Sequence, residues 1–164
     1  MTDQNQTAAD LQQRIADLRA EALDLRFSRL SQADALDLGE WLLARCRAEG
    51  HCVIVGVNLG EQVLYRAALP GTTADSHTWI DRKFAGVGRF GRSTMELELE
   101  NRCDPGFSTN RGLDQVSYGL FGGGVPLYVG DLMVGAIGVS GLESSEDHRL
   151  IVETIRAFKA AQSA

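Results

Sequence analysis

The sequence has few cysteines and no long apolar run. Its three cysteines, Cys46, Cys52 and Cys103, are odd in number and show no CxxC spacing, which argues against a disulfide framework and against a tetrahedral zinc site. No apolar stretch approaches the ~20 residues of a membrane-spanning helix, and the first residues lack the basic and apolar regions of a signal peptide. We therefore expect a cytoplasmic protein without a membrane anchor.

Positive charge is also scarce. The chain has 16 Lys and Arg residues against 22 Asp and Glu residues, a net charge of −6. The resulting negative field repels nucleic acid and anionic lipid, so neither is expected as a partner. The 164 residues, 44% of them hydrophobic and 23% charged, are typical of one globular domain with a single core.

Two capping-box patterns predict helices near the N-terminus. Thr7 with Asp10 precedes one helix, and Ser31 with Asp34 precedes the next, which Gly50 is placed to end. The first helix carries its apolar residues at alternating spacings of four and three, in a narrow seam of Leu11, Ile15, Leu18, Ala22 and Leu25. Such a seam suits packing on the helix's own domain or on another subunit.

Five β-prone segments predict an antiparallel sheet. Residues 51–59 and 62–69 flank Gly60-Glu61 and are expected to form a hairpin. Three further segments, Gln115–Phe121, Val125–Val129 and Leu132–Val139, are separated by the glycines 122–124 and by Gly130-Asp131, which suits a type II′ turn. Because short turns join all neighbouring strands, the fold class is α+β, with a five-stranded antiparallel sheet flanked by helices.

The remaining segments are predicted to be helices and one loop. Residues 73–101 should form a helix that the glycines at positions 86, 88 and 91 interrupt. Residues 102–114 contain Asp104-Pro105-Gly106 and should form a surface loop. Ser144 with Asp147 repeats the capping pattern before a last helix. That helix has an inward stripe of Leu150, Ile151, Ile155 and Phe158.

Several motifs resemble one known family. The segment Gly122-Gly123-Gly124-Val125-Pro126-Leu127, with residues 134–141 after it, is similar to the signature hairpin of the haem-degrading-domain (GlcG/HbpS-like) superfamily. Four further segments, residues 68–73, 79–83, 89–93 and 140–148, resemble an uncharacterised UPF branch of it. The resemblance implies a profilin-like fold, a homo-oligomer and, for some relatives, binding of haem or a corrinoid. It also divides the chain into a polar tail with an extra N-terminal amphipathic helix (1–27) and a single domain (28–164).

The chain departs from the family pattern at one position. Where the branch has Tyr-Ala-Ala-His-Gly-Gly, this sequence has Tyr118-Gly119-Leu120-Phe121-Gly122-Gly123. Any ligand or acid–base role of the family's histidine is lost, because a phenyl ring neither binds a metal nor transfers a proton.

The glycine run and a basic cluster are candidate ligand-binding features with two interpretations each. Gly122, Gly123 and Gly124 either present N–H groups to an anion or supply a positive φ to a turn. Arg82, Lys83, Arg89 and Arg92 either bind an anion such as a haem propionate or form a solvated face that pairs with nearby glutamates.

Six further residues complete the candidate list. Trp79 is read as lining a core or groove, and Tyr118 and Pro126 lie within the matched motifs. Asp147 and His148 begin the last helix, where they either serve the helix dipole or line a cleft with the glycine run. No histidine has a partner at metal-ligand spacing. His77, beside a matched segment, remains a candidate axial ligand of haem.

The sequence therefore leaves three functions open. The first is a small-molecule-binding domain whose ligand, by resemblance, is haem or another tetrapyrrole. The second is a homo-oligomeric adaptor that docks a partner on the N-terminal seam. The third is a haem-degrading enzyme, in which the protein positions the cofactor and admits oxygen.

Overall fold

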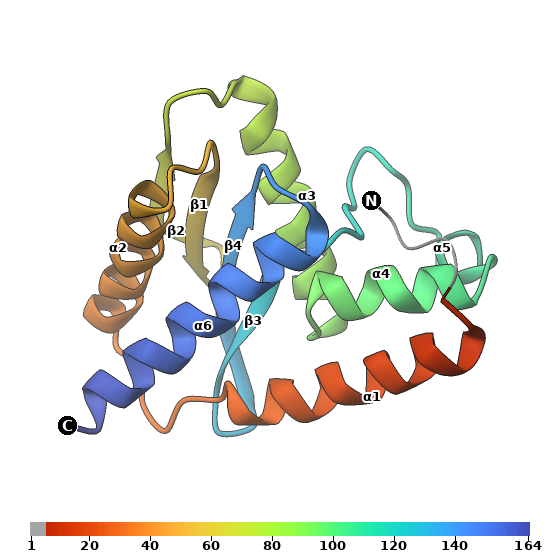
Figure 1. Ribbon diagram of the computed structural model, residues 1–164, viewed down its shortest axis with the longest axis horizontal. Coiled ribbons are helices and arrows are strands. Elements are labelled where there is room, and N and C mark those ends of the chain that lie inside the picture. Colours follow the sequence, from red (N-terminus) through yellow and green to blue (C-terminus); the bar gives the residue numbers. More distant parts are fainter. Residues whose placement is uncertain (1–5) are drawn as a thin grey trace.

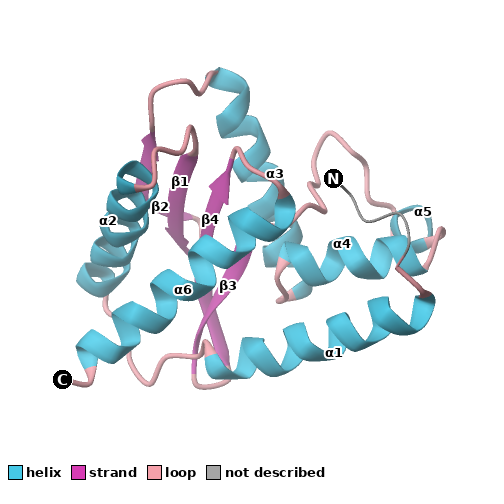
Figure 2. Ribbon diagram, in the orientation of Figure 1, coloured by secondary structure: helices cyan, strands magenta, loops and turns pink. Residues whose placement is uncertain are grey.

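The computed structural model describes residues 6–164, so the first five residues of the predicted polar tail lie outside the described part (Figure 1). The chain is α+β, with one antiparallel sheet and helices around it (Figure 2). In chain order the elements are α1 Ala8–Asp24, α2 Gln32–Ala48, β1 Ile54–Leu59, β2 Gln62–Ala68, α3 Ala74–Phe90, α4 Thr94–Cys103, α5 Phe107–Asn110, β3 Gly124–Val129, β4 Leu132–Ser140 and α6 Ser144–Gln162.

Two hairpins make up the sheet, in the strand order β2-β1-β4-β3. The central strands β1 and β4 pair antiparallel, with Val55 opposite Val139. The Gly130-Asp131 link is a tight turn, in which Gly130 has φ +60° and Asp131 has no positive φ, as a type II′ turn requires. Both predicted hairpins are thus confirmed.

Within residues 6–164 the sheet has four strands, and the fifth strand predicted at Gln115–Phe121 is wrong. These residues form turns and irregular chain, and the Gly119 N–H donates to the Arg82 carbonyl of α3 over 2.9 Å instead of joining the sheet. Val116 is 84% exposed. The β-prone composition was therefore a poor guide, because this segment bonds to a helix at Gly119 and leaves the consecutive residues 115–117 exposed.

Helices cover both faces of the sheet. Val55 and Val57 of β1 belong to the large core with α2 and α6, whereas Ile54 belongs to a smaller core with Ile80 and Phe84 of α3. Successive strand residues point to opposite faces, so α2 with α6 and α3 form the two outer layers (Figure 1).

The predicted interrupted helix is two helices. α3 ends at Gly91, whose φ of +64° is left-handed, and α4 begins after Ser93, whose hydroxyl accepts the Glu96 N–H. The stretch predicted as a surface loop contains the short helix α5, and Phe107 in it is only 2% exposed. An aromatic anchor therefore packs part of this segment onto the domain, which its polar composition concealed.

The N-terminal seam packs on α4 of the same chain. The capping box of Thr7 and Asp10 is present. The buried faces of α1 and α4 share one apolar cluster made of Leu11, Ile15, Leu18, Met95 and Leu99. α1 and α4 run side by side at one end of the molecule (Figure 1). The seam on which the adaptor interpretation depended is thus filled from within the chain.

The last helix begins differently from the prediction. Its N-cap is Glu143 rather than Ser144, without a side-chain cap, and Asp147 turns inward to other partners. The inward stripe is confirmed, since Leu150, Ile151 and Ile155 are fully buried. None of the helices in residues 6–164 combines the length and the apolar character needed to cross a membrane.

Candidate functional site

The glycine run lies where β3 begins, between α3, α4 and α6. The Gly122 N–H donates to Glu98 Oε2 over 2.9 Å, and the Gly124 N–H donates to Thr94 Oγ1 over 2.9 Å. Gly123 has φ +121°, and its carbonyl accepts the Val139 N–H. Two of the three N–H groups are therefore bonded within the chain, which is the arrangement expected of a structural turn.

Close packing explains why this run is glycine. A Cβ at Gly122 would lie 2.3 Å from the Ser144 carbonyl oxygen. A Cβ at Gly123 would lie 2.4 Å from the Val139 oxygen and 2.7 Å from Lys83 Nζ. All three distances are shorter than a Cβ contact tolerates, so the run lets the chain pass directly over the Lys83 ammonium.

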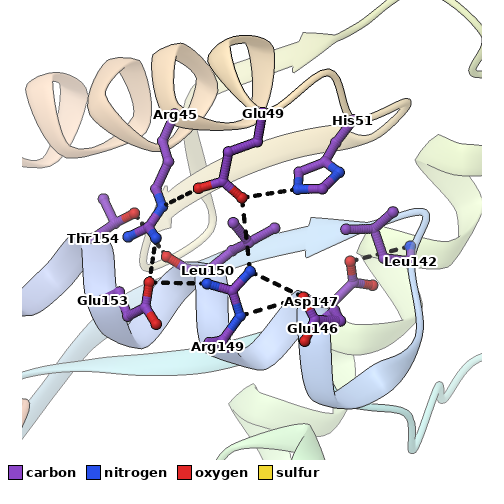
Figure 3. Close-up of polar contacts among 10 residues, drawn as sticks. All are labelled: Arg45, Glu49, His51, Leu142, Glu146, Asp147, Arg149, Leu150, Glu153 and Thr154. Atoms are coloured by element: carbon purple, nitrogen blue, oxygen red, sulfur yellow. Dashed lines mark hydrogen bonds and ion pairs between the residues drawn. The ribbon is translucent and has the colours of Figure 1, made fainter.

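Lys83 and Asp147 form a buried ion pair beneath the glycine run. Nζ of Lys83 lies 3.0 Å from Asp147 Oδ2 and 3.1 Å from the Val139 carbonyl oxygen. The two side chains are 4% and 1% exposed. Oδ1 of Asp147 accepts the Leu142 N–H (Figure 3). The pair joins α3 to the end of β4 and to α6.

Burial shifts the pKa values of both partners toward their neutral forms. Desolvation lowers the pKa of Lys83, although the nearby Asp147 carboxylate opposes it. Desolvation likewise raises the pKa of Asp147 to about 6 against the effect of the Lys83 charge. Such shifts arise when burial removes most of the water around a charged group.

Arg82 lies in a different environment from its neighbour. Its guanidinium stacks 4.1 Å from the centre of the Trp79 ring, and its Nε is buried without a hydrogen-bond partner among the described residues. No carboxylate within residues 6–164 forms an ion pair with it. The Trp79 indole N–H is occupied by Asp75 over 3.1 Å.

Two adjacent pockets meet at Trp79 and Phe121. The first, here called the Trp79 cleft, has a volume of about 400 Å³ and includes Arg82 and Tyr118 in its wall. The second, the Lys83 pocket, measures about 320 Å³ and includes Lys83 and Ser140. The Trp79 and Phe121 rings make an edge contact with centres 5.6 Å apart and form a wall of both pockets.

The other two members of the basic cluster lie elsewhere. Arg89 donates to the Arg111 carbonyl over 2.6 Å and sits 5.3 Å from the centre of the Tyr118 ring. Arg92 pairs with Glu96 over 3.1 Å and also with Glu100, and because these two carboxylates are only 3% and 16% exposed, the pairs do not form a solvated face. The four cations therefore do not form one anion-binding face.

The histidines do not converge on either pocket. His77 is exposed on α3. His51 bonds to Glu49 over 3.0 Å at the end of α2 (Figure 3). His148 is 4% exposed and lies 2.8 Å from Glu21 of α1. In residues 6–164 there is no group of three or more His, Cys, Asp or Glu that could hold a metal ion.

His148 and Pro126 line a third pocket, which is apolar and lies under α1. This pocket measures about 200 Å³. Asp147 and His148 are thus adjacent in sequence but lie on different sides of α6, because each helical residue turns by about 100° from the last. The structure brings Gly123 and Asp147 together, and it separates His148 from both.

Glu98 and Thr94 are the site residues that the sequence did not reveal as such. Both residues lie on α4. Glu98 accepts the N–H of Gly122, 24 residues away, and Thr94 accepts the N–H of Gly124, 30 residues away. No local pattern signals such a contact, because each residue also fits an ordinary amphipathic helix.

Comparisons with known proteins agree on one family. The family described as haem degrading protein HbpS-like matches residues 30–156. A UPF0303 protein of Mesorhizobium japonicum is 38% identical over 143 residues, which cover 86% of each chain. A UPF0303 protein of Brucella canis is 37% identical and covers 89% of this chain and 88% of its own.

Solved structures share the fold. Ybr137w superposes with a TM-score of 0.84 at 23% identity, over 92% of this chain and 90% of its own. PduOC, in a complex with heme, has a TM-score of 0.66 at 22% identity, over 79% of this chain and 94% of its own.

Proposed function

This chain belongs to the HbpS-like family of haem-degrading proteins, and from that premise we propose that it binds haem or another tetrapyrrole in the Trp79 cleft. One observation carries the proposal. The Arg82 guanidinium lies on Trp79 in the wall of the cleft and has no carboxylate partner within residues 6–164. A ligand carboxylate such as a propionate supplies the partner that the chain does not.

The cleft suits the macrocycle. Trp79, Tyr118 and Phe121 bring three aromatic rings to its wall, and Phe121 is 49% exposed. The volume of about 400 Å³ falls within the range of about 300–1,000 Å³ that is common for ligand pockets. A flat, apolar ring system with charged edges matches aromatic walls beside a free guanidinium.

The cleft suits the iron less well. Tyr118 is the lining residue whose phenol oxygen can ligate haem iron. His77 does not line the cleft and His148 lies in the pocket under α1, while Phe121 stands where the family resemblance implies a histidine. Binding is therefore expected to depend on the ring and its carboxylates more than on the metal.

Parallel titrations with ferric haem and with iron-free protoporphyrin test this proposal. Both should bind, and Arg82→Met should weaken both by about tenfold, because it removes a charge-assisted hydrogen bond. The control is Arg47→Met on the exposed surface of α2, which should bind as the parent does. Absence of a shifted Soret band and of Trp79 quenching at stoichiometric ligand would sink the proposal.

A second variant separates the iron from the ring. Phe121→His restores the family's histidine at the wall of the cleft. It should change the Soret spectrum of bound ferric haem, since an imidazole can ligate the iron, and leave protoporphyrin affinity within about twofold. An unchanged haem spectrum would place the ligand elsewhere.

Three further expectations join the proposal. Haem degradation is the alternative that the family's description favours, and loss of the Soret band over time with a reductant would reveal it. Self-association is tested by light scattering of the full chain. The cytoplasmic location stays a prediction, to which the free Cys46, Cys52 and Cys103 are suited.

A further inference from the structure

We propose that Lys83 is a reactive amine that forms an imine with a small aldehyde or ketone entering the Lys83 pocket, with Asp147 exchanging the proton. The proposal concerns a different pocket from the tetrapyrrole cleft and does not depend on tetrapyrrole binding. It would give the domain a covalent carbonyl chemistry in addition to a binding role.

The composition of the chain first draws attention to Lys83. Of the 16 basic residues only Lys83 and Lys159 are lysines, and the other 14 are arginines. Lys83 is 3% exposed. Arginine stays charged in proteins, whereas lysine gives up its proton when buried and becomes a nucleophile. A chain that otherwise uses arginine thus has one of its two lysines where deprotonation is easiest.

The hydrogen bonds of Lys83 Nζ do not use all of its donors. Its hydrogen bonds to Asp147 and to the Val139 carbonyl use two of its three donors. Lys83 also lines the Lys83 pocket, which continues past Ser140 and Leu142. Because residue 123 is a glycine, no Cβ lies at the 2.7 Å from Nζ that any other residue would impose there. The Lys83 side chain is therefore part of the wall of a pocket from which a small carbonyl compound would reach Nζ.

Asp147 is suited to the proton transfer. Its Oδ2 lies 3.0 Å from Nζ, within the reach that proton transfer requires. Burial lowers the pKa of Lys83 and raises the pKa of Asp147 to about 6, and both changes favour passage of the proton from nitrogen to oxygen. A perturbed pair of this kind, one member of which lines a pocket, is typical of acid–base sites.

The reaction balances without an oxidant or a reductant. Lys83 passes one proton to Asp147, and the neutral amine attacks the carbonyl carbon while the C=O electron pair moves to oxygen. That oxygen takes one proton from the amine and one from Asp147 and leaves as water. Lys83 then holds a protonated C=N bond, and Asp147 is again a carboxylate.

The chain's lysine content makes the test selective. The folded protein is treated near neutral pH with propanal and sodium cyanoborohydride, which reduces an imine to a stable adduct, and the sites are read by peptide mass mapping. Lys159, which is partly exposed on α6, is the internal control. Lys83 should be modified about tenfold faster than Lys159, because more of it is the neutral nucleophile.

Two variants test whether the rate of Lys83 modification depends on Lys83 itself and on Asp147. Lys159→Arg leaves Lys83 as the only lysine and should not change its rate. Asp147→Asn keeps the shape of the side chain but cannot exchange the proton, so it should slow Lys83 modification by about tenfold, if circular dichroism matches the parent.

The wild-type comparison decides the matter even when Asp147→Asn does not fold. A lysine that serves only to join α3 to α6 is protected by burial and is modified only when urea unfolds the chain. Modification of Lys159 with Lys83 unmodified in the folded protein would overturn the proposal, whatever the outcome of the haem titrations.

Discussion

The first turns of α6 hold two ionic regions that differ in their access to water. Asp147 points inward to Lys83, and the two side chains are 1% and 4% exposed. Arg149, two residues later, points outward and pairs with Glu146 over 2.9 Å and Glu153 over 3.0 Å (Figure 3). The side chains of this outer network are 38–48% exposed.

The number of contacts does not rank the two regions. Arg149 has three carboxylates within 3.7 Å, since Glu49 is also near, whereas Lys83 has one. Exposed pairs contribute about 0–1 kcal/mol, because water and salt screen them. Breaking a buried pair costs about 3–5 kcal/mol, because the remaining charge has no solvent. Burial, and not the count of partners, sets the consequence of a substitution.

The largest effect is expected from breaking the inner pair. Lys83→Met should lower the free energy of unfolding by about 3–5 kcal/mol at neutral pH, since it leaves Asp147 buried without its counter-charge. Urea denaturation measures the difference. Lys83→Met combined with Asp147→Leu is the control and should recover most of the loss. A loss below about 1 kcal/mol in the single variant would contradict the assigned burial cost.

A smaller effect is expected from pH. The folded pKa of Asp147 is raised to about 6 from an ordinary value of 3.8, so its stabilising contribution is fully present below pH 3.8 and is lost as pH rises through about 6. The loss amounts to at most about 3 kcal/mol.

The matched control is Asp147→Asn, which does not titrate. The stability of the parent relative to this variant should fall between pH 4 and pH 7 in urea unfolding. A difference that stays flat over this range would show that Asp147 is not desolvated as described.

The smallest effect is expected from the outer network. Arg149→Ala should lower the free energy of unfolding by less than about 1 kcal/mol, and about 0.5 M salt should reduce the difference further. Arg45 continues to pair with Glu49 and Glu153 in this variant (Figure 3). A loss as large as that of Lys83→Met would remove the distinction between the two regions.

Much of the fold could be predicted because its signals are local. The capping boxes at Thr7 and Ser31 form as predicted, and Gly91 divides α3 from α4. Each of these signals acts within about four residues, so the chain carries it wherever the element packs. The family motifs of the last third likewise led to the family that the comparisons show.

The same local signals failed where a distant group intervened. Ser144 and Asp147 have the spacing of a capping box, yet Asp147 is bound by Lys83 from 64 residues away. Residues 115–121 have β-prone residues, yet the Gly119 N–H bonds to α3. In both cases a partner far away in the sequence took the hydrogen-bonding group, the Asp147 carboxylate or the Gly119 N–H, that the predicted cap or strand would have used.

The basic cluster shows most clearly what the sequence decided and what the tertiary structure decided. The sequence alone placed Arg82, Lys83, Arg89 and Arg92 on one helical stretch and assigned the chain to its family. Only the tertiary structure paired Lys83 with a buried carboxylate, stacked Arg82 on Trp79 at the cleft and paired Arg92 with Glu96 and Glu100 of α4. For Arg82 and Lys83 the reason is that a helix turns successive side chains by about 100°, and Arg92 lies beyond the end of α3. What each side chain then meets depends on segments far away in the chain.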